Sequence, residues 1–148
     1  MFKIIERKQL SENVVKNVIH APDIAAKRKA GQFVILMINE KGERIPLTIV
    51  DSDAKTGTIT IIYQVVGKTT SAMADLKEGD YILNVLGPLG HATEIDNFGT
   101  AVCVGGGVGV GVVYPIAKAL REAGCNVVSI IGARTKDLLI LEEEMRRV

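Results

Sequence analysis

The sequence predicts two parts of different architecture: an all-β antiparallel barrel over residues 1–97 and a partial α/β unit over residues 98–148. Two observations support this division. Short segments rich in β-branched residues, separated by turns of Gly, Asp and Asn, follow one another through the first part. After them come an uninterrupted apolar strand, a glycine-rich turn and a helical segment, an order typical of a parallel sheet covered by helices.

The first part is expected to form short strands and one helix. The clearest strand is residues 58–66, which are rich in Ile, Thr, Tyr and Val. The other strands are expected at residues 2–7, 13–19, 30–38, 44–50 and 81–86. Residues 51–57 are predicted as a polar loop. Residues 69–76 begin with hydroxyl side chains and continue with Ala, Met and Leu, a pattern that predicts a short capped helix.

The second part is predicted to alternate strand and helix. Its elements are expected as a strand at residues 100–104, a glycine turn at 105–109, a helix at 110–123, a strand at 126–131 and an amphipathic helix at 136–147. Gly124 is a suitable stop for the first helix. Two parallel strands and two helices do not complete a doubly wound sheet, so we expect this Rossmann-like domain to be incomplete.

Composition and charge argue against several classes of function. The net charge is +1 and aromatic residues make up 4% of the chain, which argues against nucleic acid as a partner. The uncharged stretch at residues 97–117 holds too many glycines for a membrane span. Cys103 and Cys125 have no neighbouring His or Cys, so no metal site is predicted. Few cysteines and no signal peptide favour a cytoplasmic location.

The glycine turn is the most informative local feature. Gly105, Gly106, Gly107 and Gly109 stand between a predicted strand and a predicted helix, where glycine lets the backbone approach a pyrophosphate. The alternative is a tight turn that binds no ligand. Arg134 stands where dinucleotide-binding folds usually carry an acidic residue, and it is either a phosphate contact or a solvated loop residue. The choice between NADH and NADPH therefore stays open.

A second group of candidate residues lies in the predicted barrel. A flavin needs a flat slot, backbone groups for its ring edge, and cations or helix N-termini for its phosphates. Arg44 offers a cation, Thr48 a hydroxyl and Gly67 room for close approach, while Thr69 and Thr70 begin the predicted helix. The alternative is that these are ordinary strand and turn residues. No catalytic residue is predicted, because both histidines are isolated and no nucleophile motif is present.

The order of several motifs along the chain resembles the ferredoxin–NADP reductase superfamily. The motifs are R-x-P-L-T at residues 44–48, Y-Q-V-V-G-K-T-T at 63–70, G-P-L-G at 87–90, V-G-G-G-V-G-V at 104–110, Y-P-I-A-K-A-L at 114–120 and G-A-R-T-K-D-L-L at 132–139. The chain is most similar to the branch that contains the dihydroorotate dehydrogenase electron-transfer subunit and the small subunit of NADH-dependent reduced ferredoxin:NADP oxidoreductase, also known as a sulfide dehydrogenase subunit. The resemblance covers essentially the whole chain.

This resemblance implies an electron-transfer flavoprotein subunit that passes reducing equivalents between NAD(P)H, FAD and an iron–sulfur centre. Flavin-contacting and flavin-phosphate positions of the family match Pro46, Leu47, Thr48, Ile62, Tyr63, Gln64, Gly67, Thr69 and Thr70, and the pyrophosphate turn of the nicotinamide dinucleotide matches Gly105, Gly106, Gly107 and Gly109. The implied partner is a larger redox subunit in a heteromeric complex. Two alternatives stay open: the electron-transfer partner of dihydroorotate dehydrogenase, and a non-catalytic interaction module with a degenerate redox domain.

The sequence departs from the family pattern at three points. The family arginine belongs at the position of Ile45, whereas the arginine here is Arg44. Gly111 and Val112 stand where the family often has Ala-Pro, which we expect to loosen the start of the helix. Family members also continue further and carry a cysteine cluster for a [2Fe–2S] centre, so the ligands of that centre are expected outside these residues.

Overall fold

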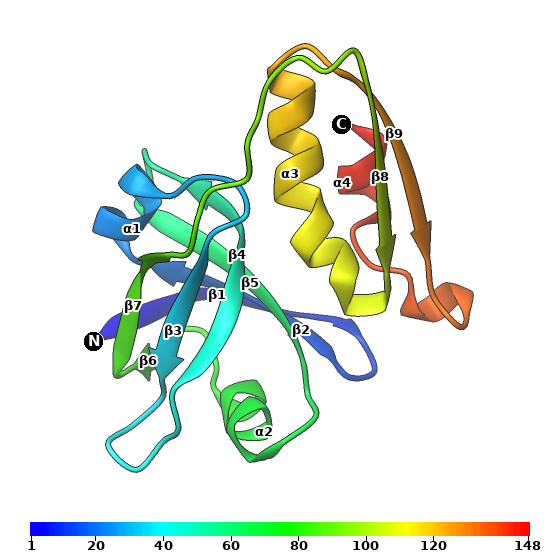
Figure 1. The fold of residues 1–148 in the computed structure, drawn as a ribbon. Helices are drawn as coiled ribbons and strands as arrows, with labels where there is room; N and C mark the ends of the chain where they lie inside the picture. The colour runs from blue at the N-terminus through cyan, green and yellow to red at the C-terminus, as the bar shows by residue number, and fades with distance from the viewer.

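The computed structural model describes residues 1–148 and shows an antiparallel barrel with a small α/β layer beside it (Figure 1). The barrel sheet has seven strands in the order β6-β1-β2-β5-β4-β3-β7, and all neighbouring pairs are antiparallel. The strands are β1 Phe2–Ser11, β2 Val14–His20, β3 Phe33–Met37, β4 Ile45–Asp53, β5 Thr58–Gln64, β6 Tyr81–Ile82 and β7 Asn84–Leu89. The predicted all-β first part is confirmed.

The single strand predicted at residues 81–86 is wrong, because this segment forms two strands that close the sheet. β6 pairs with β1 at one end of the strand order, and β7 pairs with β3 at the other end. Between them, Leu83 donates its N–H to the carbonyl of Ile38 at 3.1 Å. β7 also continues through Gly87 to Leu89, beyond the end of the predicted strand. The segment thus links the two edges of the sheet and nearly closes the barrel.

The barrel interior is filled by alternate side chains of its strands. On β5, Ile59, Ile61 and Tyr63 face inward, and none is more than 2% exposed. On β4, Ile49 is fully buried in the same core and Leu47 packs against it. Because a strand directs successive side chains to opposite faces, the intervening residues of β4 and β5 point out of the barrel.

One polar pair is buried in this interior. Asn17 is fully buried, and its amide nitrogen donates to the hydroxyl of Tyr63 at 3.4 Å. The amide oxygen of Asn17 has no hydrogen-bond partner. Burial raises the pKa of Tyr63 to about 12, although the hydrogen bond from Asn17 opposes this shift. The pair is therefore held by one long hydrogen bond in an otherwise apolar core.

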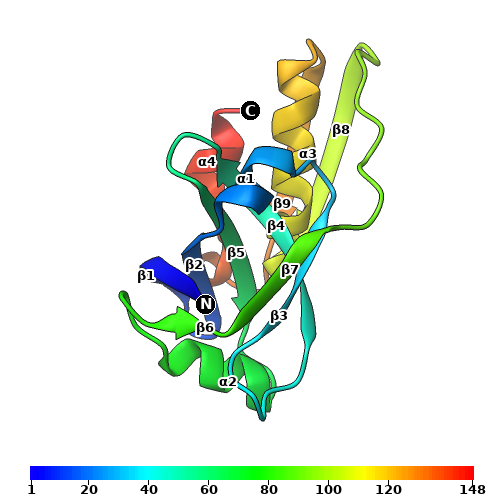
Figure 2. The same ribbon diagram turned by 90° about the vertical axis from the view of Figure 1, so that its left-hand side faces the viewer.

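Two helices belong to the first part. α2, Lys68–Asp75, confirms the predicted short helix and lies at the end of the barrel away from the α/β layer (Figures 1 and 2). α1, Pro22–Lys27, was not indicated by the sequence pattern. It begins with proline at its first position, where the missing N–H removes no hydrogen bond.

The second part forms the expected β-α-β arrangement. β8, Thr100–Gly106, and β9, Asn126–Gly132, are paired in parallel, and α3, Val110–Glu122, connects them after the short 3₁₀ turn η1, Gly107–Gly109. Val102, Val104, Val128 and Ile130 on one face of this two-stranded sheet are 44–64% exposed. The opposite face packs against α3 and α4, Glu142–Arg146.

The continuous helix predicted at residues 136–147 is wrong. A 3₁₀ turn, η2, covers Lys136–Leu138, the chain then extends, and α4 starts only at Glu142 after Leu141 in the left-handed conformation (φ 56°). Ile140 and Met145 are both buried in the core cluster that contains α3. The break lets both apolar side chains reach this core, which a regular helix of the same residues would not do.

The loop predicted at residues 51–57 is also partly wrong, because β4 continues through Asp53. Polar residues at its end pair with β5, with Asp51 opposite Thr60, Ser52 opposite Ile59 and Asp53 opposite Thr58. Hydrogen bonding along the ladder thus outweighs the low strand preference of Asp.

Removing the hydroxyl of Tyr63 tests the buried polar pair. Tyr63→Phe leaves the amide of Asn17 without any partner, so we expect a loss of about 1–3 kcal/mol in the free energy of unfolding. Asn17→Leu/Tyr63→Phe removes both polar groups and should recover most of that loss. Urea unfolding measures both, and a double variant no more stable than Tyr63→Phe would contradict the assignment.

Candidate functional site

A slot lies between the outer face of the barrel and the start of α3. Its floor is formed by the outward residues of β4 and β5, and its roof by the glycine turn and the first turn of α3. The cavity has a volume of about 430 Å³ and is lined by Ile45, Pro46, Leu47, Thr48, Val50, Ile62, Tyr63, Gln64, Val66, Thr70, Val108, Gly111 and Val112. It is mostly apolar, with Thr48, Gln64 and Thr70 as its polar side chains.

The roof is close to the floor because of Gly111. A Cβ atom at this position would meet Val50 Cγ2 at 3.5 Å and Ile62 Cβ at 3.6 Å, which is ordinary van der Waals contact. A larger side chain would have to displace α3 from β4 and β5. The spacing between α3 and the barrel therefore admits only glycine or alanine at this position. The expectation that Gly111 loosens the helix start is not supported, since α3 begins at Val110.

Seven of the predicted flavin-contacting residues line this slot, but two of them point away from it. They are Pro46, Leu47, Thr48, Ile62, Tyr63, Gln64 and Thr70. The side chains of Leu47 and Tyr63 face the barrel core, so these two residues reach the slot through their backbone. Because side chains alternate along a strand, those that point into the slot belong to Pro46, Thr48, Ile62 and Gln64.

The start of α2 lies beside the slot, and the hydroxyl groups of Thr69 and Thr70 there are already hydrogen-bonded within the protein. The Thr70 hydroxyl oxygen accepts from the N–H groups of Val66 and Gly67, each at 3.0 Å. Thr69 donates to the Glu43 carboxylate at 3.1 Å. These two hydroxyls stabilise the helix start, so any phosphate there would meet backbone N–H groups of the first helical turn.

Gly67 leaves open space at this helix start. Its backbone is extended (φ −155°), a conformation open to any residue, and a Cβ atom would meet nothing within 4 Å. Neither backbone strain nor packing therefore requires glycine here.

Arg44, the predicted cation of the flavin site, is exposed, has no ion pair in the structure and does not line the slot.

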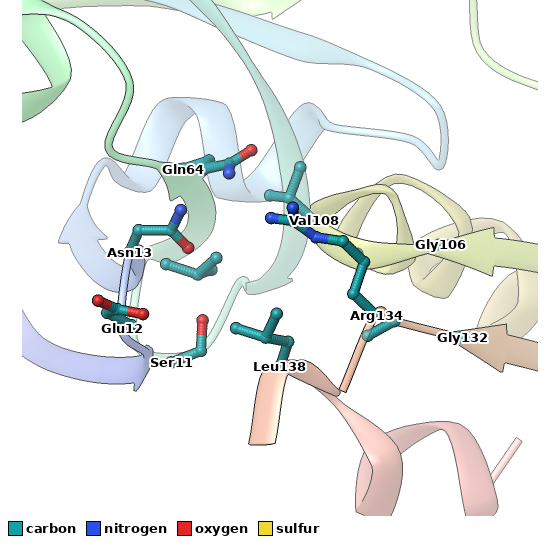
Figure 3. A pocket seen from close by; sticks show the side chains of 12 residues that line it. Ser11, Glu12, Asn13, Gln64, Gly106, Val108, Gly132, Arg134 and Leu138 are labelled. Carbon is teal, nitrogen blue, oxygen red and sulfur yellow. The ribbon is translucent and has the colours of Figure 1, made fainter. Parts of the chain in front are cut away.

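A second cavity, of about 540 Å³, opens between the barrel and the carboxyl ends of β8 and β9 (Figure 3). Gly106 and Gly107 line it from the glycine turn, and Gly132 and Arg134 line it from the end of β9. The β1–β2 hairpin contributes Ser11, Glu12 and Asn13 from the barrel side. Gln64 and Val108 line both cavities, so the second cavity adjoins the slot.

The four glycines predicted at the pyrophosphate turn have different structural roles. Gly107 has φ +54°, which favours glycine, and a Cβ at Gly105 would lie 3.1 Å from Val110 Cα. At Gly106 the nearest atom to a Cβ is 3.9 Å away, and at Gly109 nothing lies within 4 Å. Conformation favours glycine at Gly107 and packing favours it at Gly105, whereas at Gly106 and Gly109 the backbone is open to the exterior. Gly106 and Gly107 line the second cavity, and Gly105 and Gly109 do not.

The charged groups of the second cavity come from different parts of the chain. The Arg134 side chain extends from the end of β9 towards Val108 and Gln64 (Figure 3). It has no hydrogen bond or ion pair in the structure, which leaves its cation available to a ligand. The hairpin residues Ser11, Glu12 and Asn13 also line this cavity. They were not predicted, because no motif in the sequence marks them.

The two cysteines are buried and are not part of either cavity. Burial raises the pKa of Cys103, and the nearby Cys125 adds to the shift. A raised pKa keeps the Cys103 thiol protonated and unreactive. No cluster of His, Cys, Asp or Glu in the structure could hold a metal ion, and no helix is long and apolar enough to cross a membrane.

Residues 1–93 match the family described as oxidoreductase FAD-binding domain. A Thermotoga maritima protein named dihydroorotate dehydrogenase B (NAD(+)), electron transfer subunit homolog, is 47% identical over 146 residues, which cover 99% of this chain and 52% of that protein. The electron transfer subunit of dihydroorotate dehydrogenase B from Geobacillus thermodenitrificans is 35% identical over 147 residues, 95% of this chain and 57% of that protein. The chain thus spans about half the length of the curated relatives it matches.

Solved structures give the same picture of the fold. A chain from the NADH-dependent reduced ferredoxin-NADP oxidoreductase, studied for flavin-based electron bifurcation, superposes with a TM-score of 0.95 and 46% identity over 99% of this chain and 53% of that chain. Phthalate dioxygenase reductase superposes with a TM-score of 0.82 at 17% identity, over 97% of this chain and 46% of that chain. The second likeness concerns the fold alone.

Substitutions at Gly111 test the contact between α3 and the barrel. Gly111→Ala fits at van der Waals distance and replaces a glycine in the first turn of α3, so it should leave the free energy of unfolding unchanged or raise it by up to about 0.5 kcal/mol. Gly111→Val overpacks the contact and should lower it by about 1–3 kcal/mol. Urea unfolding without added cofactor measures both, and equal stability of the two variants would argue against the close contact.

Proposed function

The chain belongs to the oxidoreductase FAD-binding domain family, and from this premise we propose that it holds FAD in the slot between the barrel and α3, and a nicotinamide dinucleotide in the adjoining cavity. In this proposal residues 1–97 are the FAD-binding barrel, and residues 98–148 are the N-terminal part of an NAD(P)-binding α/β domain. The single observation that carries it is that the two cavities share Gln64 and Val108. Two rings bound in these cavities would meet there.

The slot has the chemical character that a flavin ring requires. Apolar side chains on both walls suit a planar aromatic system, and Thr48 and Gln64 offer polar groups to its edge. The open space at Gly67 and the unpaired N–H groups of the first turn of α2 suit the phosphates of the cofactor. Thr69 and Thr70 act in this proposal by shaping the helix start.

The second cavity suits a dinucleotide. The backbone at Gly106 has no side chain and is open to a ligand. The N-terminal end of α3 attracts negative charge, and Arg134 supplies a cation that has no partner within the protein. Arg134 serves NADH or NADPH equally in this role, because both carry the pyrophosphate. Gly105 supports the turn by packing against Val110 rather than by contact with the ligand.

The proposed activity is transfer of reducing equivalents between NAD(P)H, FAD and an iron–sulfur centre. A flavin held in the slot would supply the capacity to take up a hydride from a nicotinamide and to release single electrons. The chain's own residues bind the two rings, align them at Gln64 and Val108, and exclude water from the slot. The iron–sulfur centre is proposed to lie outside these residues, in a larger redox partner or in sequence beyond them. In this proposal the complex is heteromeric.

A second candidate is the electron-transfer subunit of a dihydroorotate dehydrogenase. The names of the relatives from Thermotoga maritima and Geobacillus thermodenitrificans favour it. The two candidates share the FAD and nicotinamide sites and differ in the partner that exchanges electrons with the flavin. Co-purification with a flavoprotein that oxidises dihydroorotate would favour this second candidate.

Gly67→Ala tests the flavin site without disturbing the fold. The added methyl group has free space in the protein, so stability should change by less than about 1 kcal/mol. It would lie where a phosphate approaches, and FAD affinity should fall about tenfold, equivalent to one charge-assisted hydrogen bond. Fluorescence titration with FAD measures the affinity. Gly132→Ala, equally open but outside the slot, is the control. A parent chain that binds no FAD would refute the flavin proposal.

Gly106→Ala tests the dinucleotide site in the same way. Its backbone is extended (φ −122°) and tolerates a side chain, so folding and FAD affinity should not change. Binding of NADH or NADPH should weaken about tenfold, because the methyl group blocks close approach of a pyrophosphate. Isothermal titration calorimetry checks this, and unchanged affinity for both dinucleotides would exclude the turn as their binding site.

A further inference from the structure

A β-bulge gives β4 two consecutive residues on the same face. The register pairs Ile49 with Ile61 and then Asp51 with Thr60, so Val50 is an extra residue on β4. In a regular strand Val50 and Asp51 would point to opposite sides. Here Val50 packs near Gly111 and Asp51 bonds to Lys118, so both face α3.

Asp51 is held by cations from both parts of the chain. Lys118 Nζ of α3 donates to both carboxylate oxygens of Asp51, at 2.9 and 3.1 Å. Arg28, which follows α1 in the barrel part, donates from Nη2 to Asp51 at 3.2 Å and from Nε to the Ser52 hydroxyl at 2.7 Å. The Arg28 side chain is only 10% exposed. Arg28 thus fixes the carboxylate within the barrel, and Lys118 is the bond that crosses to the second part.

This ion pair lies on the same face of α3 as the roof of the slot. Lys118 follows Gly111 by about two helical turns, so both residues point to β4. Burial lowers the pKa of Lys118, but the hydrogen bond and charge of Asp51 outweigh burial and raise it overall. Lys118 therefore remains a cation at neutral pH and the bond persists.

We propose that Asp51 and Lys118 form a clamp that holds α3 on the barrel and thereby fixes the height of the flavin slot. This inference rests on the proposed function, and it makes the two residues positioning residues, since neither lines the slot. Gly111 supplies the apolar contact at the slot end of the helix. The clamp supplies the second point of attachment, which prevents α3 from tilting away from Pro46 and Thr48.

The test compares Lys118→Met, which keeps the apolar stem and removes the charge, with Lys118→Arg, which restores the cation. Arg146→Met is the matched control, because its ion pair with Glu142 at 2.7 Å lies within α4 and does not bridge the two parts. Two properties of the FAD-loaded chain are measured: the dissociation constant of FAD and the quenching of bound-flavin fluorescence by acrylamide. The second property reports access to the slot.

Lys118→Met should raise both the FAD dissociation constant and the acrylamide quenching constant by about two- to fivefold, as expected for loss of a partly exposed ion pair. Lys118→Arg should restore both values, and Arg146→Met should leave them unchanged. Parent-like values in Lys118→Met would overturn the clamp while leaving the flavin site intact.

A measurement without flavin separates this inference from the proposed function. Hydrogen exchange of the Val50 and Asp51 amides in the FAD-free chain should accelerate in Lys118→Met and return to the parent rate in Lys118→Arg. If the parent chain fails to bind FAD, the proposed function is refuted. The exchange rates still show whether the ion pair holds α3 on the barrel. Equal exchange in all variants would overturn the clamp.

Discussion

The contact between the first turn of α3 and the outer face of β4 and β5 is the constraint on which both cavities depend. Between Gly111 and the side chains of Val50 and Ile62 there is room for no more than a methyl group. This contact roofs the slot with Val108 and Val112 and places the glycine turn beside Gln64. Without α3 the slot would lose its roof, and without the barrel the second cavity would lose the wall formed by Ser11, Glu12, Asn13 and Gln64.

The glycines divide into those that the fold favours and those that it does not. Glycine is favoured at Gly107 by backbone conformation and at Gly105 by packing, and both reasons hold whether or not a ligand binds. Gly67, Gly106 and Gly109 satisfy no internal requirement of the fold. Open backbone of this kind costs conformational entropy on folding, and close approach of a phosphate is a physical reason to retain it.

Local patterns in the sequence predicted the main helices and strands but not the contacts between distant segments. The strand alternation of β5, the helix at α2 and the β-turn-α order at β8 and α3 were predicted because each depends on neighbouring residues. The split of residues 81–86, the break before α4 and the bulge at Val50 follow from contacts between distant segments. No short-range signal marks them.

The same limit applies to the candidate site. Residues 45–48 and 62–64 line the slot as two groups, yet the inward direction of the Tyr63 side chain depends on the register within the barrel. The Ser11–Asn13 hairpin enters the second cavity only because the two parts pack together.

A crystal structure of the chain with FAD would show where the flavin binds. We expect the flavin ring between β4 and α3, in contact with Pro46, Thr48 and Gln64, with one edge towards the cavity of Gly106 and Arg134. A ring bound elsewhere on the barrel, with the slot closed by the chain's own side chains, would contradict this proposal.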